Sequence, residues 1–382
     1  MTEIRSDKSS KFNFYGKEES VLVAGVAIVL MYCLHLFYHP EWYLENVSAQ
    51  SHIGQIGDYI TKFFSSAGGI CVEIFAFTSG YALWLNRRKQ SAKIRSKRLI
   101  SFLIGYWIVF AAFLVIGYFN NDKLPSLNDL CLNAFGIKVG PSQWVNVPFA
   151  WYVCYYIEFV LLSPFILKLF SSGKKIYDLL ALTVIVFLMG LIQMPVFTKY
   201  PTISYPITHI WPILAGCIGL LVCKYGIFEK VEPRLKKANI YVIMVFFILC
   251  IGAVSLLKKL FFYTGPEYYF MLILGNALVA MMLVALIVEF TKRISIVYVR
   301  KSILFLGALS MYLWFWHGIF FTGKNFGQAQ LYFIKEPLLI LLLSFVITIP
   351  LAFVTMKLHN AISSKLFPKG RSSASEIKKP SV

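Results

Sequence analysis

Charged residues are scarce in this sequence, and acidic residues are the scarcest of them. Asp, Glu, Lys and Arg together make up 14% of the 382 residues, whereas soluble domains carry about 25%. Hydrophobic residues make up 58%, and Asp and Glu together number only 18. This composition excludes an ordinary soluble domain and is typical of a chain that lies mostly within a membrane.

Cysteine is also sparse, and its number is odd. Six of the seven cysteines lie in long apolar stretches, so no disulfide framework is expected and the thiols are interpreted as small buried hydrophobic groups. A cleavable signal peptide is not expected either. Residues 1–19 are polar, and the apolar stretch that follows is too long for a signal sequence.

Long apolar stretches recur along nearly the whole chain. A membrane-spanning helix needs about 20 apolar residues, and no connection is long enough to build a soluble core. The sequence therefore predicts an all-α bundle of ten transmembrane spans, with a membrane domain at 20–357 between tails at 1–19 and 358–382. The ten predicted spans are residues 20–39, 63–85, 99–118, 147–167, 179–194, 208–223, 239–256, 268–288, 303–322 and 337–356.

The net charge of +19 follows the membrane topology. In a soluble protein this charge would suggest nucleic acid as a partner, but here 29 of the 37 Lys and Arg residues fall in one set of alternate connections and 8 in the other. Basic residues favour the cytoplasmic side of a membrane. We therefore expect both termini in the cytoplasm, a lipid bilayer around the chain and no nucleic-acid partner.

The connection at 86–98 holds the densest positive charge, seven basic residues that include Arg88, Arg95 and Arg98. One interpretation is simple topology, with attraction to lipid headgroups. The other is a rim that binds phosphate, because guanidinium groups match phosphate geometry and a nucleotide-bearing donor would arrive from the cytoplasm.

Two histidines lie inside predicted spans, His35 in the first and His317 in the ninth. An imidazole is costly in lipid, and its pKa near neutrality suits it to accept protons. Each lies about fifteen residues from the inner end of its span, so at 1.5 Å per residue both belong to the outer third of the membrane. A shared cavity near the external face is therefore possible.

Only two acidic residues fall well inside spans, Glu73 and Glu158. An intramembrane carboxyl group is a candidate functional group, although a hydrogen-bonded structural role is the alternative. Ser79 and Gly80 follow Glu73 and permit either close helix packing or a hydroxyl group beside a ligand.

Aromatic residues cluster at the start of the fourth span, among them Trp151, Tyr152 and Tyr155. Such residues are enriched at membrane interfaces, so an interfacial belt is one interpretation. A platform on which a sugar stacks is the other.

Taken together, these segments resemble acyltransferase family 3, integral-membrane enzymes that O-acylate surface polysaccharides, lipopolysaccharide and peptidoglycan. Each motif is weak alone, but five occur in order on the appropriate spans. The matching segments are Gly25 to His35, Phe75 to Tyr81, Arg88 to Arg98 with Tyr106-Trp107, Trp151 to Pro164, and Leu306 to His317.

The resemblance implies acetyl-CoA or another acyl-CoA as donor, a carbohydrate hydroxyl as acceptor, and a bacterial cell membrane. It favours His35 as the base that accepts the hydroxyl proton, or as a transient acyl carrier, with His317 as the second candidate. Glu73 or Glu158 would fix the tautomer of His35, and Ser79 would polarise the thioester carbonyl.

In this interpretation Arg88, Arg95 and Arg98 bind the donor phosphates, and Trp151, Tyr152 and Tyr155 contact the acceptor. No metal is expected. Neither the acceptor sugar nor the oligomeric state follows from the sequence.

One position departs from the family pattern. The family usually has Arg or Lys eleven residues before the first-span histidine, and here that residue is Ala24. Eleven residues of helix cover about 16 Å, which places the missing cation near the inner face. An inactive relative therefore stays a possible interpretation, as does a proton-coupled transporter or flippase of a lipid-linked sugar.

Overall fold

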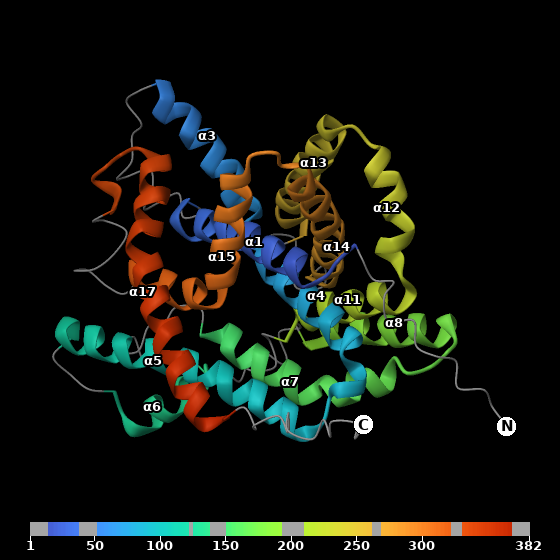
Figure 1. The fold of residues 1–382 in the computed structure, drawn as a ribbon, viewed down its shortest axis with the longest axis horizontal. Coiled ribbons are helices and arrows are strands. Elements are labelled where there is room, and N and C mark those ends of the chain that lie inside the picture. The colour runs from blue at the N-terminus through green and yellow to red at the C-terminus, as the bar shows by residue number, and fades with distance from the viewer. Residues whose placement is uncertain are drawn as a thin grey trace, which may run out of the picture.

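The computed structural model describes residues 14–37, 52–121, 125–137, 150–192, 210–261, 269–321 and 331–368, and its regular structure there is entirely helical (Figure 1). This confirms the predicted all-helical fold. The helices are α1 (Lys17–Phe37), α3 (His52–Ala67), α4 (Ile70–Leu85), η1 (Arg87–Lys89), α5 (Ala92–Asn121), α6 (Leu127–Asn133), α7 (Trp151–Leu169), α8 (Lys175–Ile192), α11 (Ile213–Tyr225), α12 (Ile227–Lys237), α13 (Ile240–Phe261), α14 (Tyr269–Arg293), α15 (Val297–Trp316), η4 (His317–Phe321) and α17 (Pro337–Leu366).

Within the described residues, eight helices are long and apolar enough to cross a membrane, and a bent pair brings the number to nine. The bent pair is α3 with α4, which meet at 48° where the sequence predicts one span at 63–85. The sixth predicted span, 208–223, corresponds to α11, which is shorter. The structure does not assign a side of the membrane to the termini, so the cytoplasmic orientation stays a prediction.

Gly68 and Gly69 form the break between α3 and α4. A side chain at Gly68 would collide with the backbone of Leu30 and with Leu34 on α1, so the turn requires a residue without a side chain. The start of α4 is thereby held against the C-terminal part of α1, at Leu30 and Leu34.

Helices α1 and α15 approach each other through glycine on both sides. A Cβ at Gly25 would collide with the carbonyl of Ile303, and a Cβ at Gly307 would collide with the carbonyl of Val21. Small residues allow transmembrane helices to approach this closely. Each glycine precedes the histidine of its own helix by the same interval, so this crossing also sets the relative positions of His35 and His317.

The two ends of the bundle differ in chemistry, and we name them here. The basic end is the end at which α1 and α15 begin, and the histidine end is the end at which they terminate. At the basic end, Arg300 pairs with Glu18 at 2.6 Å and Lys292 pairs with Glu19 at 3.8 Å. These pairs join connections that the charge alternation predicts on the same side of the membrane.

A buried ion pair ties two further predicted same-side connections together. Lys224 pairs with Asp178, which also accepts a hydrogen bond from Tyr225. The ammonium group of Lys224 donates in addition to the carbonyls of Phe170 at 2.8 Å and Ser172 at 2.6 Å. Lys224 and Tyr225 both donate to Oδ2 of Asp178, and the pairing with Lys224 offsets the cost of burying this almost fully buried aspartate.

Candidate active site

The two intramembrane histidines meet at the histidine end. His35 lies in the last turn of α1, and His317 is the first residue after α15, where the helix tightens into the 3₁₀ segment η4. Their ring centroids are 4.9 Å apart. His35 is partly exposed, whereas His317 is 1% exposed. The structure thus brings together two residues that are 282 positions apart in the sequence.

The tautomer of His317 is fixed by the backbone. Nδ1 of His317 is hydrogen-bonded to the carbonyl oxygen of Trp314 in the last turn of α15. A carbonyl oxygen only accepts, so Nδ1 carries the proton, and in the neutral ring Nε2 holds the lone pair. The bond also satisfies a carbonyl at a helix C-terminus, where intrahelical donors run out.

Tyr32 supports the pair from one turn below His35. Its hydroxyl donates to Thr348 of α17 at 2.8 Å, and its ring stacks on Phe345 at 4.3 Å. The same ring lies 6.1 Å from the ring of His317. The imidazole of His317 therefore lies between the rings of Tyr32 on α1 and Trp314 on α15, and α17 holds Tyr32 in place.

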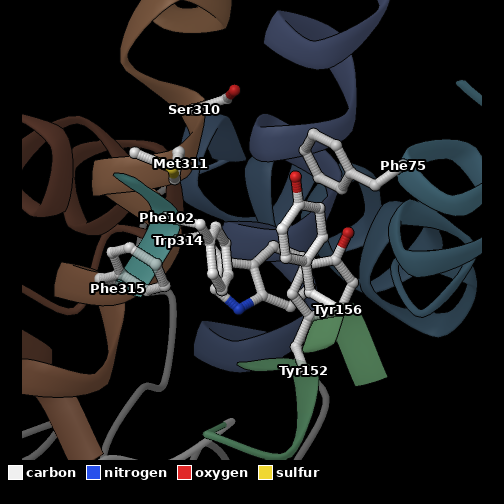
Figure 2. Close-up of a pocket in the computed structure, with 8 residues that line it drawn as sticks. All are labelled: Phe75, Phe102, Tyr152, Tyr156, Ser310, Met311, Trp314 and Phe315. Carbon is white, nitrogen blue, oxygen red and sulfur yellow. The ribbon is translucent and has the colours of Figure 1, made fainter. Parts of the chain in front are cut away.

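A cavity of about 170 Å³ lies beside the histidine pair. Trp314 belongs to its wall, and on the same helix turn its ring makes an edge contact with His317 at 5.9 Å. Figure 2 shows the rings of Trp314, Tyr152 and Tyr156 grouped together in the wall of this cavity. We name it the aromatic cavity; its lining residues are Phe75, Phe102, Tyr152, Tyr156, Ser310, Met311, Trp314 and Phe315.

The basic start of α5 leads toward the aromatic cavity. Arg95, Arg98 and Phe102 are spaced i, i+3 and i+7, so they share one face of the helix. Phe102 lies on Tyr156 with ring centroids 4.1 Å apart, and Arg98 is close enough to Tyr156 for an electrostatic interaction. The two arginines are partly buried, whereas Arg88 in η1 is exposed. The structure thus places Arg98 near Tyr156 of the cavity wall, Arg95 one turn earlier on the same helix face, and Arg88 on the surface.

The two intramembrane acids have hydrogen-bond partners of their own. Glu73 is 2% exposed, hydrogen-bonds to Asn276 of α14, and lines a second cavity. Glu158 accepts a weak hydrogen bond from the thiol of Cys154, 3.6 Å away in its own helix. The sequence analysis expects a carboxylate to fix the tautomer of His35. In the structure, the tautomer of His317 is fixed by a backbone carbonyl.

Ser79 and the three predicted acceptor-binding aromatics take different positions. The hydroxyl of Ser79 donates to the carbonyl of Phe75 at 2.9 Å, within its own helix. Tyr152 lines the aromatic cavity, and Trp151 stacks on Trp211 at 5.9 Å. Tyr155 is buried in the core, 6.1 Å from Phe159. The predicted platform is therefore divided, and only Tyr152 faces the aromatic cavity.

The sequence analysis does not single out His359, which lies three residues beyond the end of the predicted span 337–356. α17 continues to Leu366, and His359 is buried between Tyr312 at 2.6 Å and Ser101 at 3.0 Å. A stripe of buried polar residues along α17, Ser344, Thr348, Thr355 and His359, is the signal that could have revealed it.

These features define a class first: a multi-pass helical membrane protein with a pair of imidazoles next to an aromatic cavity. The family follows from comparison with known proteins. The acyltransferase domain of acyltransferase family 3 matches residues 22–357, and the chain belongs to this family. Neither the curated proteins nor the solved structures gave a match.

Proposed function

We propose that this protein is an O-acyltransferase of the bacterial cell membrane that moves an acyl group, most simply acetyl, from acyl-CoA to a hydroxyl of a surface polysaccharide or its lipid-linked precursor. The observation that carries the proposal is the 4.9 Å imidazole pair beside a cavity that leads to Arg98. Family membership supports acyl transfer.

The donor enters from the basic end. Arg95 and Arg98 bind its phosphates, because both are partly buried on the helix face that leads to Phe102. Its acyl-bearing arm then follows Phe102 and Tyr156 into the aromatic cavity, whose apolar walls suit a thioester. Arg88 contributes long-range attraction from the surface.

Acyl transfer requires a base, because an alcohol is a weak nucleophile at neutral pH. His35 takes the proton of the acceptor hydroxyl as its oxygen attacks the thioester carbonyl. The carbon–sulfur bond then breaks, and the departing thiolate of CoA receives the proton from His35. His317, whose ring lies 4.9 Å from that of His35 and whose Nε2 holds a lone pair, orients the His35 ring and so keeps one of its nitrogens available as the base.

The acceptor enters from the histidine end, which is the external end if the charge alternation is right. The rings of Tyr152 and Trp314 lie 4.6 Å apart at an angle of 36°, and they provide an aromatic surface for a sugar ring next to His317, whose ring lies 5.9 Å from that of Trp314.

A transporter of a lipid-linked sugar is the second candidate. The break at Gly68 and Gly69 favours it, since discontinuous helices form the binding sites of many transporters. A transporter would need no acyl donor, so the two functions differ in whether acyl-CoA is consumed.

Deletion of the gene in its source organism tests the proposal. We expect O-acyl signals to disappear from the NMR spectrum of the surface polysaccharide while the polysaccharide itself still reaches the surface. The wild-type gene should restore the signals, and His35→Ala should not, although the variant protein is present in the membrane. Loss of the polysaccharide itself would instead support transport.

A further inference from the structure

A second cavity, separate from the aromatic cavity, lies at the histidine end between α4, α13 and α14. Its volume is about 180 Å³. Glu73 and Phe75, two residues apart on α4, point in nearly opposite directions at 100° per residue, so α4 separates the two cavities. We name this space the Glu73 cavity; its lining residues are Ser66, Gly69, Ile70, Glu73, Trp211, Val254, Lys258, Leu272, Ile273 and Asn276.

The polar groups that line the Glu73 cavity make only some of the hydrogen bonds they are capable of. Glu73 hydrogen-bonds to Asn276, yet Oε2 of Glu73 and Oδ1 of Asn276 have no partner among the described residues. Both atoms are buried, and an unpaired buried oxygen is costly. A ligand with several hydroxyl groups would supply the missing donors, and Lys258 adds a cationic donor to the same wall.

An aromatic surface completes the cavity. Trp211 lines it, as an apolar face on which a sugar ring can stack. Apolar rings with a few convergent polar groups are typical of small-ligand sites. Carboxylate, amide, ammonium and indole groups together fit a carbohydrate better than a lipid tail or a metal ion.

A row of aromatic rings joins the Glu73 cavity to the histidine pair. Trp211 stacks on Trp151 at 5.9 Å, and Trp151 contacts Tyr152 at 6.0 Å. Tyr152 then lies 4.6 Å from Trp314, which borders His317. The row thus links one wall residue of the Glu73 cavity, Trp211, to two wall residues of the aromatic cavity, Tyr152 and Trp314.

We propose that the Glu73 cavity is a distal subsite for the acceptor glycan, where it binds a sugar residue that is not itself acylated. The inference rests on the proposed function. It gives Glu73 a role in acceptor binding and none in acyl transfer. The enzyme therefore selects acceptors of several residues over single sugars.

The probes for a test are oligosaccharides of defined length prepared from the unacylated polysaccharide of the deletion strain. The purified protein in detergent transfers radiolabelled acetyl groups from acetyl-CoA to them. We expect Glu73→Gln and Asn276→Leu each to raise the KM for long oligosaccharides about 10-fold, the effect of losing one hydrogen bond to a charged or buried group. The KM for acetyl-CoA and the rate with single sugars should not change.

The two adjacent lysines of α13 supply a matched control. Lys258 lines the cavity, whereas Lys259 is exposed outside it. Lys258→Met should raise the acceptor KM, and Lys259→Met should not. Because the two variants make the same change at adjacent positions of one helix, a difference between them reports on the cavity and not on folding. Equal acceptor KM values in wild type, Glu73→Gln and Lys258→Met would overturn the subsite, while transfer itself by these proteins would leave the proposed function standing.

Discussion

Two variants, His317→Asn and His317→Gln, distinguish the contributions of the two nitrogens of the His317 ring. The amide nitrogen of Asn occupies the place of Nδ1 and can still donate to the carbonyl of Trp314. The amide group of Gln extends to the place of Nε2 and loses that bond. We therefore expect His317→Asn to fold like the wild type and transfer poorly, and His317→Gln to be less stable yet retain more transfer.

The magnitudes follow from the contacts. The Nδ1 bond to Trp314 contributes about 1 kcal/mol, and up to about 3 kcal/mol if its loss leaves the buried carbonyl without a donor. Loss of the base itself, as in His35→Ala, should slow transfer about 10²- to 10⁴-fold. Loss of the group that orients the base should cost less, so His317→Asn is expected between His35→Ala and the wild type.

Two measurements check this prediction: the thermal unfolding midpoint from tryptophan fluorescence in detergent, and transfer from radiolabelled acetyl-CoA. Gln is larger than Asn, so void volume alone predicts that His317→Gln is the more stable variant. That order of stability, or wild-type transfer by His317→Asn, would refute the assignment of Nδ1 as donor and Nε2 as acceptor.

Three further predictions concern packing and donor binding. Gly307→Leu should lower the thermal unfolding midpoint strongly, because a side chain there collides with the backbone of α1. Gly252→Leu should be tolerated, because Gly252 faces open space. Equal midpoints of the two variants would contradict the close packing of α1 on α15. Arg98→Ala should raise the KM for acyl-CoA about 10-fold, and Lys93→Ala, at an exposed position, should raise it much less. Steady-state kinetics at varied acyl-CoA concentration would show this difference. Equal effects would mean that the basic residues of 86–98 act only through their total charge. Ala24→Arg restores the cation usual in the family and should lower the KM for acyl-CoA, and an unchanged KM would place residue 24 outside the donor site.

The fold class was largely predictable because a membrane imposes one strong rule. Every backbone polar group in lipid must be satisfied within a helix or a closed barrel, so long apolar stretches identify helices directly. Two predicted spans differ from the structure. The span at 63–85 is broken at Gly68, and 208–223 forms only the short helix α11. Hydropathy averages over a window, so it registers neither a bend nor a helix end inside an apolar stretch.

The candidate site was predictable in its residue types but not in its groupings. His35 and His317 were recognised as unusual because imidazoles are rare in lipid, and the structure brings them together. Glu73 was equally recognisable, but its distance from the histidines depends on which face of α4 it occupies. His359 was missed because the end of an apolar stretch does not reveal whether the helix continues into a packed interior.

The sequence by itself determined that this chain is a helical membrane protein and to which family it belongs. It also determined which polar residues inside the spans are candidate functional residues. The tertiary structure alone decided which of those residues meet. The reason is that hydropathy acts locally along one helix, whereas the crossing of α1 and α15 at Gly25 and Gly307, and the rotation of α4 between two cavities, depend on contacts between segments that are distant in the sequence.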